Sequence, residues 1–350
     1  MEFDLQKLVR ENIQKLTPYS SARHEFTGKG SVFLDANENA YGSPLEEKFN
    51  RYPDPLQWQL KFQLARIKGV PAENIFIGNG SDEVIDLAYR IFCNPGKDNV
   101  IVCPPTYGMY EVSANINDVA IKKVSLTPSF QLDVEGILSA VDANTKLLFI
   151  CSPNNPTGNN MAREDIEILL NNFPGIILID EAYINFSKQK SFIQELTEYP
   201  NLVVMQTLSK AWGLAALRLG LCYGSMDIID LFNKVKPPYN VNGASQQLGL
   251  EALQHTTLVN DWISATVSQR ELLIQNVSTL SFVERIYPSD ANFFLMKVKD
   301  AGKLYSYLSG HEIVVRNRSK DPGCENCLRI TIGTPEENEQ LITLLNNYGQ

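Results

Sequence analysis

"TKLLFICSPNNPTGNNMAREDIEILLNNFPGIILIDEAY", residues 145–183, holds two runs of apolar and β-branched residues separated by an amphipathic stretch. The runs at 145–153 and 175–183 predict buried β-strands, and the stretch at 163–173 predicts a helix. Further apolar runs predict strands at 74–80, 99–105, 120–126, 202–209 and 218–224, and amphipathic stretches predict helices at 82–92 and 135–141. Strands that alternate with helices in this way are typical of a layered α/β sheet.

The composition is that of an ordinary folded protein, because 44% of the 350 residues are hydrophobic and 20% are charged. The 31 basic and 40 acidic side chains give a net charge of −9 and form no basic run, which argues against nucleic acid as a partner. The first residues carry charges throughout, and no apolar run is long enough to span a bilayer. We therefore expect a soluble, cytoplasmic protein that makes no membrane contact.

The chain is long enough for two domains. The expected strands above belong to a large domain over residues 30–245. After a break at Pro237 and Pro238, a long helical stretch over 244–278 is expected to lead to a smaller α+β domain. We expect strands of that domain at 291–298, 312–319 and 327–334. The small domain is expected to comprise 246–350 together with 1–29, the N-terminal segment returning to pack on it.

The six cysteines do not suggest a metal site. Cys93, Cys103, Cys151 and Cys222 stand alone in apolar surroundings, where a reduced cysteine acts as a small core residue. Cys324 and Cys327 form a C-x-x-C pair, but no second pair or histidine lies near enough in sequence to complete a tetrahedral site. A loop with incidental thiols is the favoured interpretation, with a redox or distant-ligand role left open.

Polar residues follow several expected strands, and open α/β sheets bind ligands at the carboxyl ends of their strands. Gly78, Gly80 and Ser81 precede a helix whose free N–H groups suit a phosphate, although a plain helix cap gives the same string. Asn155 lies in an Asn-Pro-Thr-Gly turn, which is also a common loop. Asp180 closes an almost wholly apolar strand, where a carboxylate needs a cation. A structural arginine or a protonated ring nitrogen would meet that need.

The stretch "TLSKAWGLAALRLG", residues 207–220, places a lysine at a further strand end. A lysine buried there has a lowered pKa and serves as an amine nucleophile, whereas Lys210 taken alone is an ordinary surface residue. Ser209 and Arg218 offer a hydroxyl and a guanidinium to a phosphate. Together with Asp180 and the hydroxyl of Tyr183, they indicate a ligand with an aldehyde, a pyridinium nitrogen, a phenolic oxygen and a phosphate. That ligand is pyridoxal 5′-phosphate.

In this order and spacing, the motifs resemble those of the fold-type I pyridoxal-phosphate-dependent aminotransferases of class II. Within that group the chain is similar to the histidinol-phosphate aminotransferase family over about residues 30–335, on the motifs "FLDANENAYG", "RYPDP", "GNGSDE", "PTYGMY", "SPNNPTG", "DEAYINF", "TLSKAWGLAALRLG" and "LRITIGT". The resemblance implies an α/β fold with a large, mixed but mostly parallel seven-stranded sheet flanked by helices, plus a smaller α+β domain. It also implies an obligate homodimer with shared active sites.

The resemblance assigns roles to single residues. Lys210 carries the cofactor as a Schiff base and moves the substrate proton, and Asp180 keeps the ring nitrogen protonated. Asn155 and Tyr183 bond the phenolate oxygen of the ring, and Tyr107 stacks on its face. The phosphate is held by residues of two loops, Gly80, Ser81, Asp82, Thr207, Ser209 and Arg218, of which Thr207 also fits an ordinary strand position.

Further residues are expected to reach the substrate or the partner subunit. Tyr52 would contact the cofactor phosphate of the partner, unless it merely packs in a Pro-bounded loop. Arg329 matches the carboxylate-binding arginine of the family. Arg316 is a second candidate anion ligand, although it also fits a surface strand and Arg318 competes with it for the role.

Asn37, Glu38 and Asn39 are expected near the substrate, where Glu38 would suit an imidazole. The family usually reads Asn-Pro-Tyr-Gly at a position where this chain has Ala40 in place of the proline. The change removes some rigidity from that loop.

The implied reaction converts L-histidinol phosphate and 2-oxoglutarate to imidazole acetol phosphate and L-glutamate in histidine biosynthesis, by ping-pong transfer through Lys210. A threonine-phosphate decarboxylase or an aromatic amino acid aminotransferase of the same fold remains an alternative, because the cofactor-binding residues serve all three reactions. A regulator with an aminotransferase-like domain is disfavoured, since the chain keeps the lysine and has no basic helix-turn-helix segment.

Overall fold

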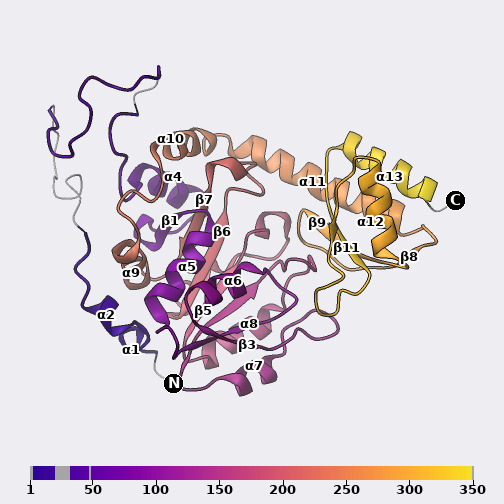
Figure 1. Cartoon of the computed structure of the whole chain (residues 1–350), viewed down its shortest axis with the longest axis horizontal. Coiled ribbons are helices and arrows are strands. Elements are labelled where there is room, and N and C mark those ends of the chain that lie inside the picture. Colours follow the sequence, from indigo (N-terminus) through magenta and orange to yellow (C-terminus); the bar gives the residue numbers. More distant parts are fainter. Residues whose placement is uncertain (1–2, 20–31, 47–48, 349–350) are drawn as a thin grey trace.

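The computed structural model describes residues 3–19, 32–46 and 49–348 and contains two sheets, one in a large domain and one in a small domain (Figure 1). The large sheet has the order β1-β7-β6-β5-β4-β2-β3. Its strands are β1 (Ile75–Asn79), β2 (Asn99–Val102), β3 (Ala120–Lys123), β4 (Thr145–Cys151), β5 (Ile176–Asp180), β6 (Leu202–Thr207) and β7 (Leu219–Tyr223). Only β7 runs antiparallel to its neighbours in this sheet. The expected fold class is confirmed.

The central strands are continuous apolar runs because helices cover both of their faces. In β5 the side chains alternate between two cores: Ile177 and Ile179 point to one, and Ile176 and Leu178 to the other. The first face is covered by α4 (Trp58–Lys68), α7 (Val134–Ala140) and α8 (Arg163–Asn172), and the second by α5 (Ser81–Phe92), α6 (Met109–Ile116) and α9 (Met226–Val235). The short 3-10 turns η1 (Ala72–Asn74), η2 (Ile184–Phe186), η3 (Phe192–Glu195) and η4 (Ala215–Leu217) complete this domain.

The N-terminal segment does not pack where we expected. Helices α1 (Leu5–Leu8) and α2 (Glu11–Gln14) lie against the large domain, well away from the small one (Figure 1). Val9 and Ile13 are buried in the second core, and the Arg10 amide donates a hydrogen bond to the Ile91 carbonyl at 3.0 Å. The apolar side chains of this segment are thus covered by α5 and α9. Residues 20–29 of the expected segment lie outside the described part of the chain.

The long helical stretch expected over 244–278 is two helices, α10 (Gly243–Ala252) and α11 (Thr256–Val277). The chain turns between them because Leu253 is fully buried in the large-domain core. Helix α10 stays with the large domain, where the Ser245 hydroxyl donates to the Leu217 carbonyl at 2.7 Å. Helix α11 then runs across to the small domain (Figure 1).

The small domain is an antiparallel sheet of order β10-β11-β9-β8 with helices on one face. Its elements are β8 (Val283–Ile286), β9 (Phe293–Val298), α12 (Ala301–Gly310), β10 (Arg316–Asn317), β11 (Cys327–Thr331) and α13 (Pro335–Tyr348). Leu328 and Ile330 of β11 point into the core beneath α12 and α13, so Arg329 between them points to the other face, toward the large domain. The strand expected over 312–319 is reduced to the two residues of β10.

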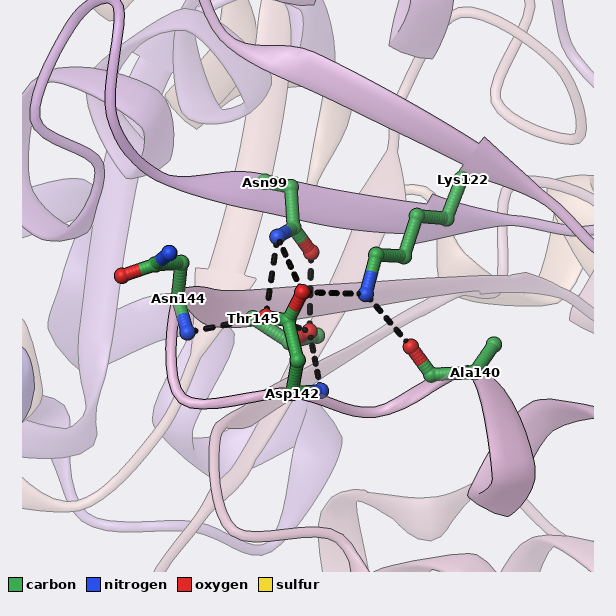
Figure 2. A network of polar contacts seen from close by, with 6 residues as sticks. All are labelled: Asn99, Lys122, Ala140, Asp142, Asn144 and Thr145. Atoms are coloured by element: carbon green, nitrogen blue, oxygen red, sulfur yellow. Dashed lines mark hydrogen bonds and ion pairs between the residues drawn. The ribbon is translucent and has the colours of Figure 1, made fainter.

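A polar network joins the amino ends of neighbouring strands of the large sheet (Figure 2). The carboxylate of Asp142 accepts hydrogen bonds from Lys122 Nζ at 2.6 Å and Asn99 Nδ2 at 3.0 Å. The Thr145 hydroxyl lies 2.8 Å from Asn99 Oδ1, and Lys122 also donates to the Ala140 carbonyl at 2.7 Å. The network therefore fixes the edge of the sheet opposite the carboxyl ends of the strands.

Among the described residues, no helix is both long and apolar enough to cross a membrane.

Candidate active site

The carboxyl ends of the parallel strands open into a cavity of about 820 Å³ between the large and the small domain. The residues expected to bind cofactor or substrate that line it are Ser81, Asp82, Tyr107, Asn155, Asp180, Tyr183, Thr207, Ser209, Lys210, Arg218, Arg316 and Arg329. They come from seven separate loops and strands. Their convergence follows from the parallel arrangement, which places the ends of β2, β4, β5 and β6 on one edge.

The loop between β1 and α5 has the form of a phosphate cradle. Gly80 adopts a φ of +81°, which favours glycine, and no side chain caps the N-terminus of α5. The backbone of β7 packs directly against this loop, since a Cβ on Gly220 would lie 2.2 Å from Ser81 N. The Arg218 guanidinium lies 3.3 Å from Asp82 Oδ2 at the mouth of the loop. The loop thus presents backbone N–H groups, the positive end of a helix dipole and a guanidinium to a single anion-binding position.

Asp180 is a fully buried carboxylate at the end of β5. Burial raises its pKa, and the hydrogen bond from the Tyr110 hydroxyl to Oδ2, 2.8 Å long, acts in the opposite direction. The Ala182 amide donates to Oδ1 at 3.0 Å. Within the described residues no lysine, arginine or histidine forms an ion pair with it. Such a carboxylate is prepared for a cationic partner that enters the cavity.

Lys210 lies three residues beyond β6, and its ammonium nitrogen lies 5.7 Å from the ring centroid of Tyr183. Burial lowers the pKa of Lys210, and the positive charge of Arg329 lowers it further. Lys210 therefore loses its proton more readily than an exposed lysine does, which favours the neutral, nucleophilic amine.

Asn155 joins the cofactor end of the cavity to the arginine end. Its Nδ2 lies 3.4 Å from the Tyr183 hydroxyl, and its Oδ1 accepts a hydrogen bond from Arg329 Nη1 at 2.5 Å. The Arg329 guanidinium also lies 5.1 Å from the ring centroid of Phe293. Burial lowers the pKa of Arg329 and raises that of Tyr183. The Arg329 guanidinium lines the cavity, where it favours a ligand group with a negative charge.

Tyr107, Thr207 and Ser209 complete the wall. The Tyr107 hydroxyl donates to Asp82 Oδ1 at 3.0 Å, and burial raises the pKa of this phenol, as does the charge of Asp82. Thr207 Oγ1 accepts a hydrogen bond from the Ser209 amide at 3.1 Å, which holds the turn that leads to the lysine.

Comparison with known proteins identifies the family. Residues 33–345 match the model of aminotransferases of class I and II. The chain is 52% identical over 348 residues to the histidinol-phosphate aminotransferase of Cytophaga hutchinsonii, an alignment that covers 99% of this chain and 100% of the relative. The chain belongs to the histidinol-phosphate aminotransferase family. The expected family and enzyme class are thus confirmed.

Solved structures of the histidinol-phosphate aminotransferase family share the fold. The enzyme from Clostridium acetobutylicum superposes with a TM-score of 0.79 at 23% identity, over 86% of this chain and 91% of the other. The enzyme from Sinorhizobium meliloti, solved in complex with pyridoxal 5′-phosphate, gives a TM-score of 0.77 at 22% identity, over 89% and 90% of the two chains.

The cavity fits pyridoxal phosphate, and the expected cofactor is confirmed by the family. The uncapped N-terminus of α5 and Arg218 suit its phosphate, and the buried carboxylate of Asp180 suits its protonated ring nitrogen. No cluster of three or more metal-ligating side chains is found in the described part of the chain.

The structure does not bring Tyr52, Asn37, Glu38 or Asn39 into this cavity. Tyr52, Asn37 and Glu38 line a separate hollow of about 560 Å³, where Tyr52 stacks on Tyr239 with ring centroids 4.4 Å apart. Glu38 is paired with Arg51 at 2.6 Å and accepts the Tyr52 amide at 2.7 Å, so it braces this loop within the protomer. The expected role of Tyr52 at the partner's cofactor and the expected roles of Asn37, Glu38 and Asn39 near the substrate stay predictions.

Sequence reasoning missed two residues of the site. Tyr110 belongs to the motif "PTYGMY" and lies in the first turn of α6, whereas Tyr107 precedes that helix; the two rings pack edge to face. Asp321 lines the cavity from a loop of the small domain whose sequence gave no signal for it.

Proposed function

We propose that this chain transfers the amino group of L-histidinol phosphate to 2-oxoglutarate, giving imidazole acetol phosphate and L-glutamate. The observation that carries the proposal is the convergence of Lys210, Asp180 and a set of arginines on one cavity, in a chain 52% identical over its length to a histidinol-phosphate aminotransferase. The place of the reaction is histidine biosynthesis.

When bound, pyridoxal phosphate supplies an electrophilic carbon and a ring that accepts the electrons released at the substrate Cα. The protein does the rest. The Asp180 carboxylate would hold the proton on the ring nitrogen, and the ring of Tyr107 would pack against the cofactor ring. Ser81, Ser209 and Arg218 would bind the phosphate. The Lys210 amine would move the proton from the substrate Cα to the electrophilic carbon, a task that suits a partly buried lysine of lowered pKa.

One pocket serves both substrates in turn. The amino alcohol phosphate and the dicarboxylate each carry an anion away from the reacting carbon, and guanidinium groups recognise phosphate and carboxylate alike. Arg329 is the proposed ligand of this anion, with Arg316 beside it. On ligand entry Arg329 exchanges its bond to Asn155 for bonds to the anion, which leaves Asn155 free for the cofactor ring.

The visible absorption spectrum of the purified, cofactor-loaded enzyme, in which we expect a yellow band, tests the proposal. Histidinol phosphate added without keto acid is expected to remove the band, and 2-oxoglutarate to restore it. Lys210→Ala is expected to bind the cofactor and to lose turnover by at least about 10³-fold. The matched variant Lys188→Ala changes an exposed lysine and is expected to turn over normally. Near-normal turnover of Lys210→Ala would overturn the lysine assignment.

The same experiment separates the alternatives. Release of carbon dioxide from threonine phosphate, with no band loss on histidinol phosphate, would indicate the decarboxylase. Efficient transfer from tyrosine or phenylalanine in preference to histidinol phosphate would indicate an aromatic amino acid aminotransferase.

We also propose that the active unit is a homodimer. Leu34, Tyr41, Leu45, Phe49 and Tyr52 are exposed over a stretch that lies apart from the cavity. A second copy would cover these apolar side chains and bring Tyr52 to a cofactor phosphate. The molar mass in solution is expected to be twice that of the chain. We place the enzyme in the cytoplasm, which agrees with its six unpaired, buried cysteines.

A further inference from the structure

Three arginines share one face of the small sheet. Arg316 of β10 lies opposite Arg329 of β11 in antiparallel register. The ladder continues by one more pair, since the Arg318 amide donates to the Cys327 carbonyl at 2.9 Å. Residues two apart on a strand point to the same side, so Arg318 shares the face of Arg316 and Arg329.

This face is the wall of the active-site cavity. Arg316, Arg318 and Arg329 all line it, together with Lys210 and Tyr183. The three guanidinium groups are close enough to affect one another, because the charges of Arg318 and Arg316 both add to the lowering of the Arg329 pKa by burial. Like charges facing each other across strands destabilise a sheet, so the arrangement favours an anion that enters between them.

A single carboxylate of the small domain accompanies these arginines in the cavity wall. Arg318 Nε lies 2.5 Å from Asp321 Oδ2, and both side chains are largely shielded from solvent, with exposed fractions of 19% and 28%. The pair leaves Arg318 Nε without a well-aligned hydrogen bond, and Arg329 Nε also lacks one within the described residues. Three positive charges and one negative charge give this wall a net charge of +2, which matches a phosphate monoester dianion.

The loop that carries Asp321 is held by successive turns. The Asp321 amide donates to the Arg318 carbonyl at 2.9 Å, the Cys324 amide to the Asp321 carbonyl at 3.0 Å, and the Cys327 amide to the Cys324 carbonyl at 3.0 Å. Both cysteines are fully buried in the core between the domains. They anchor the loop, so the distance from Asp321 to Arg318 is fixed by packing.

We propose that Arg318, held in place by Asp321, is a third ligand of the substrate phosphate and favours the phosphate substrate over the dicarboxylates. The inference rests on the proposed function and deepens it. A dianion with three equivalent oxygens has room for three guanidinium partners, whereas a carboxylate with a single charge is satisfied by one bidentate arginine and its neighbour. Asp321 acts as a positioning residue.

The test compares Arg318→Gln, Arg318→Lys and Asp321→Asn with the matched control Lys320→Gln, which removes a positive charge from an exposed position of the same loop. For Arg318→Gln, the KM for histidinol phosphate is expected to rise about tenfold or more, while the KM for glutamate changes less than about threefold. Arg318→Lys is expected to recover part of the loss, and Asp321→Asn to show a smaller rise without a change in kcat. Lys320→Gln is expected to match the wild type.

Binding of inorganic phosphate to the cofactor-loaded enzyme, measured by calorimetry, gives a readout independent of turnover. Arg318→Gln is expected to weaken it and Lys320→Gln to leave it unchanged. The inference is overturned if Arg318→Gln leaves phosphate affinity unchanged, or if it raises the KM of both substrates equally. If the wild type does not convert histidinol phosphate, the proposed function fails, and the calorimetric comparison still decides the role of Arg318.

Discussion

Tyr110 shows how a residue that does not touch the ligand can set the charge of one that does. Its hydroxyl is fully buried and donates a hydrogen bond to Asp180 at 2.8 Å, and the Ala182 amide donates a second one to the same carboxylate. Hydrogen bonds to the ionised form favour ionisation, whereas burial disfavours it. The Tyr110 hydroxyl therefore favours the charged form of the carboxylate and opposes the rise in pKa that burial causes.

Tyr110→Phe is expected to raise the pKa of Asp180 further and to lower kcat by roughly tenfold. The tenfold figure is what a shift of about one pKa unit gives, because one unit corresponds to about 1.4 kcal/mol. The acidic limb of the pH–rate profile should move to higher pH, a change that a loss of packing alone would not cause. The matched control is Tyr89→Phe, which removes another buried phenol hydroxyl, one that donates to the Tyr110 carbonyl at 2.8 Å. An unchanged acidic limb in Tyr110→Phe would contradict the assignment.

At the scale of elements, the junction of β7 with the β1–α5 loop decides how well the phosphate is held. Gly220→Ala would place a Cβ 2.2 Å from two backbone atoms of Gly80 and Ser81, so the loop must move. We expect the affinity for pyridoxal phosphate to fall by about tenfold or more, because the backbone N–H groups at the start of α5 no longer point toward the phosphate. In Gly224→Ala, directly after the same strand, the Cβ would lie 3.4 Å from the Ile228 side chain and 3.7 Å from the Leu202 carbonyl oxygen, which are ordinary contacts, so this variant is expected to keep its affinity. Equal cofactor affinities by fluorescence titration would refute the close-packing argument.

The elements that sequence predicts well are those with a local physical signature. Apart from β3, whose residues are exposed or half-buried, each strand of the large sheet follows an apolar run that is buried on both faces, and each site loop of the large domain follows directly from such a strand. The break at Leu253 lacked a signature, because neither glycine nor proline marks it and the turn is set by burial of that leucine. Local sequence patterns also could not predict where Val9 and Ile13 pack, since two apolar side chains do not specify which domain will cover them.

For the site, the sequence predicted the residues at strand ends and missed those whose role depends on the third dimension. Lys210 and Asp180 were found because a charged group beside an apolar run demands an explanation. Arg318 and Asp321 are only three residues apart, but their place in the cavity wall beside Arg329 depends on the register of β10 against β11, which sequence does not reveal.

At the scale of the whole molecule, the proposed homodimer with shared sites can be tested by mixing two inactive variants. Lys210→Ala and Tyr52→Ala protomers each lack one part of a shared site, but in a mixed dimer one site regains both parts. Random reassociation of equal amounts is expected to restore about a quarter of wild-type activity if both parents are inactive. Two Lys210→Ala preparations mixed in the same way serve as the control and should stay inactive. No recovery from the mixture would place Tyr52 outside the partner's site.

The polar network around Asp142 lies at the end of the large sheet opposite the active site, so we expect it to affect stability and not catalysis. Hydrogen bonds from Lys122 and then Asn99 lower the pKa of Asp142 well below its usual value. Because the folded-state pKa lies below the unfolded one, the stabilisation by this carboxylate is complete above the unfolded-state pKa of about 4, decreases below it, and is lost as the pH falls through the folded-state pKa. Asp142→Asn is expected to lower Tm at pH 7 by a few degrees at most, with unchanged KM, and the difference from the wild type is expected to shrink as the pH falls below about 4. Asp261→Asn, on the exposed face of α11, is the control. A Tm difference that does not shrink with acid would rule out this linkage.

Helix α11 gives the pocket a mechanical property. With 22 residues, it is about 33 Å long, so a tilt of about 5° at its first turn moves its last turn by roughly 3 Å. The helix is tied to the arginine-bearing half of the cavity, since Arg270 donates to the Ala291 carbonyl at 2.7 Å just before β9. If α11 rotated by this amount about a point near Leu253, the side of the cavity that carries Arg329 would move by about the length of one hydrogen bond. Such a movement would let one pocket bind two substrates of unequal length.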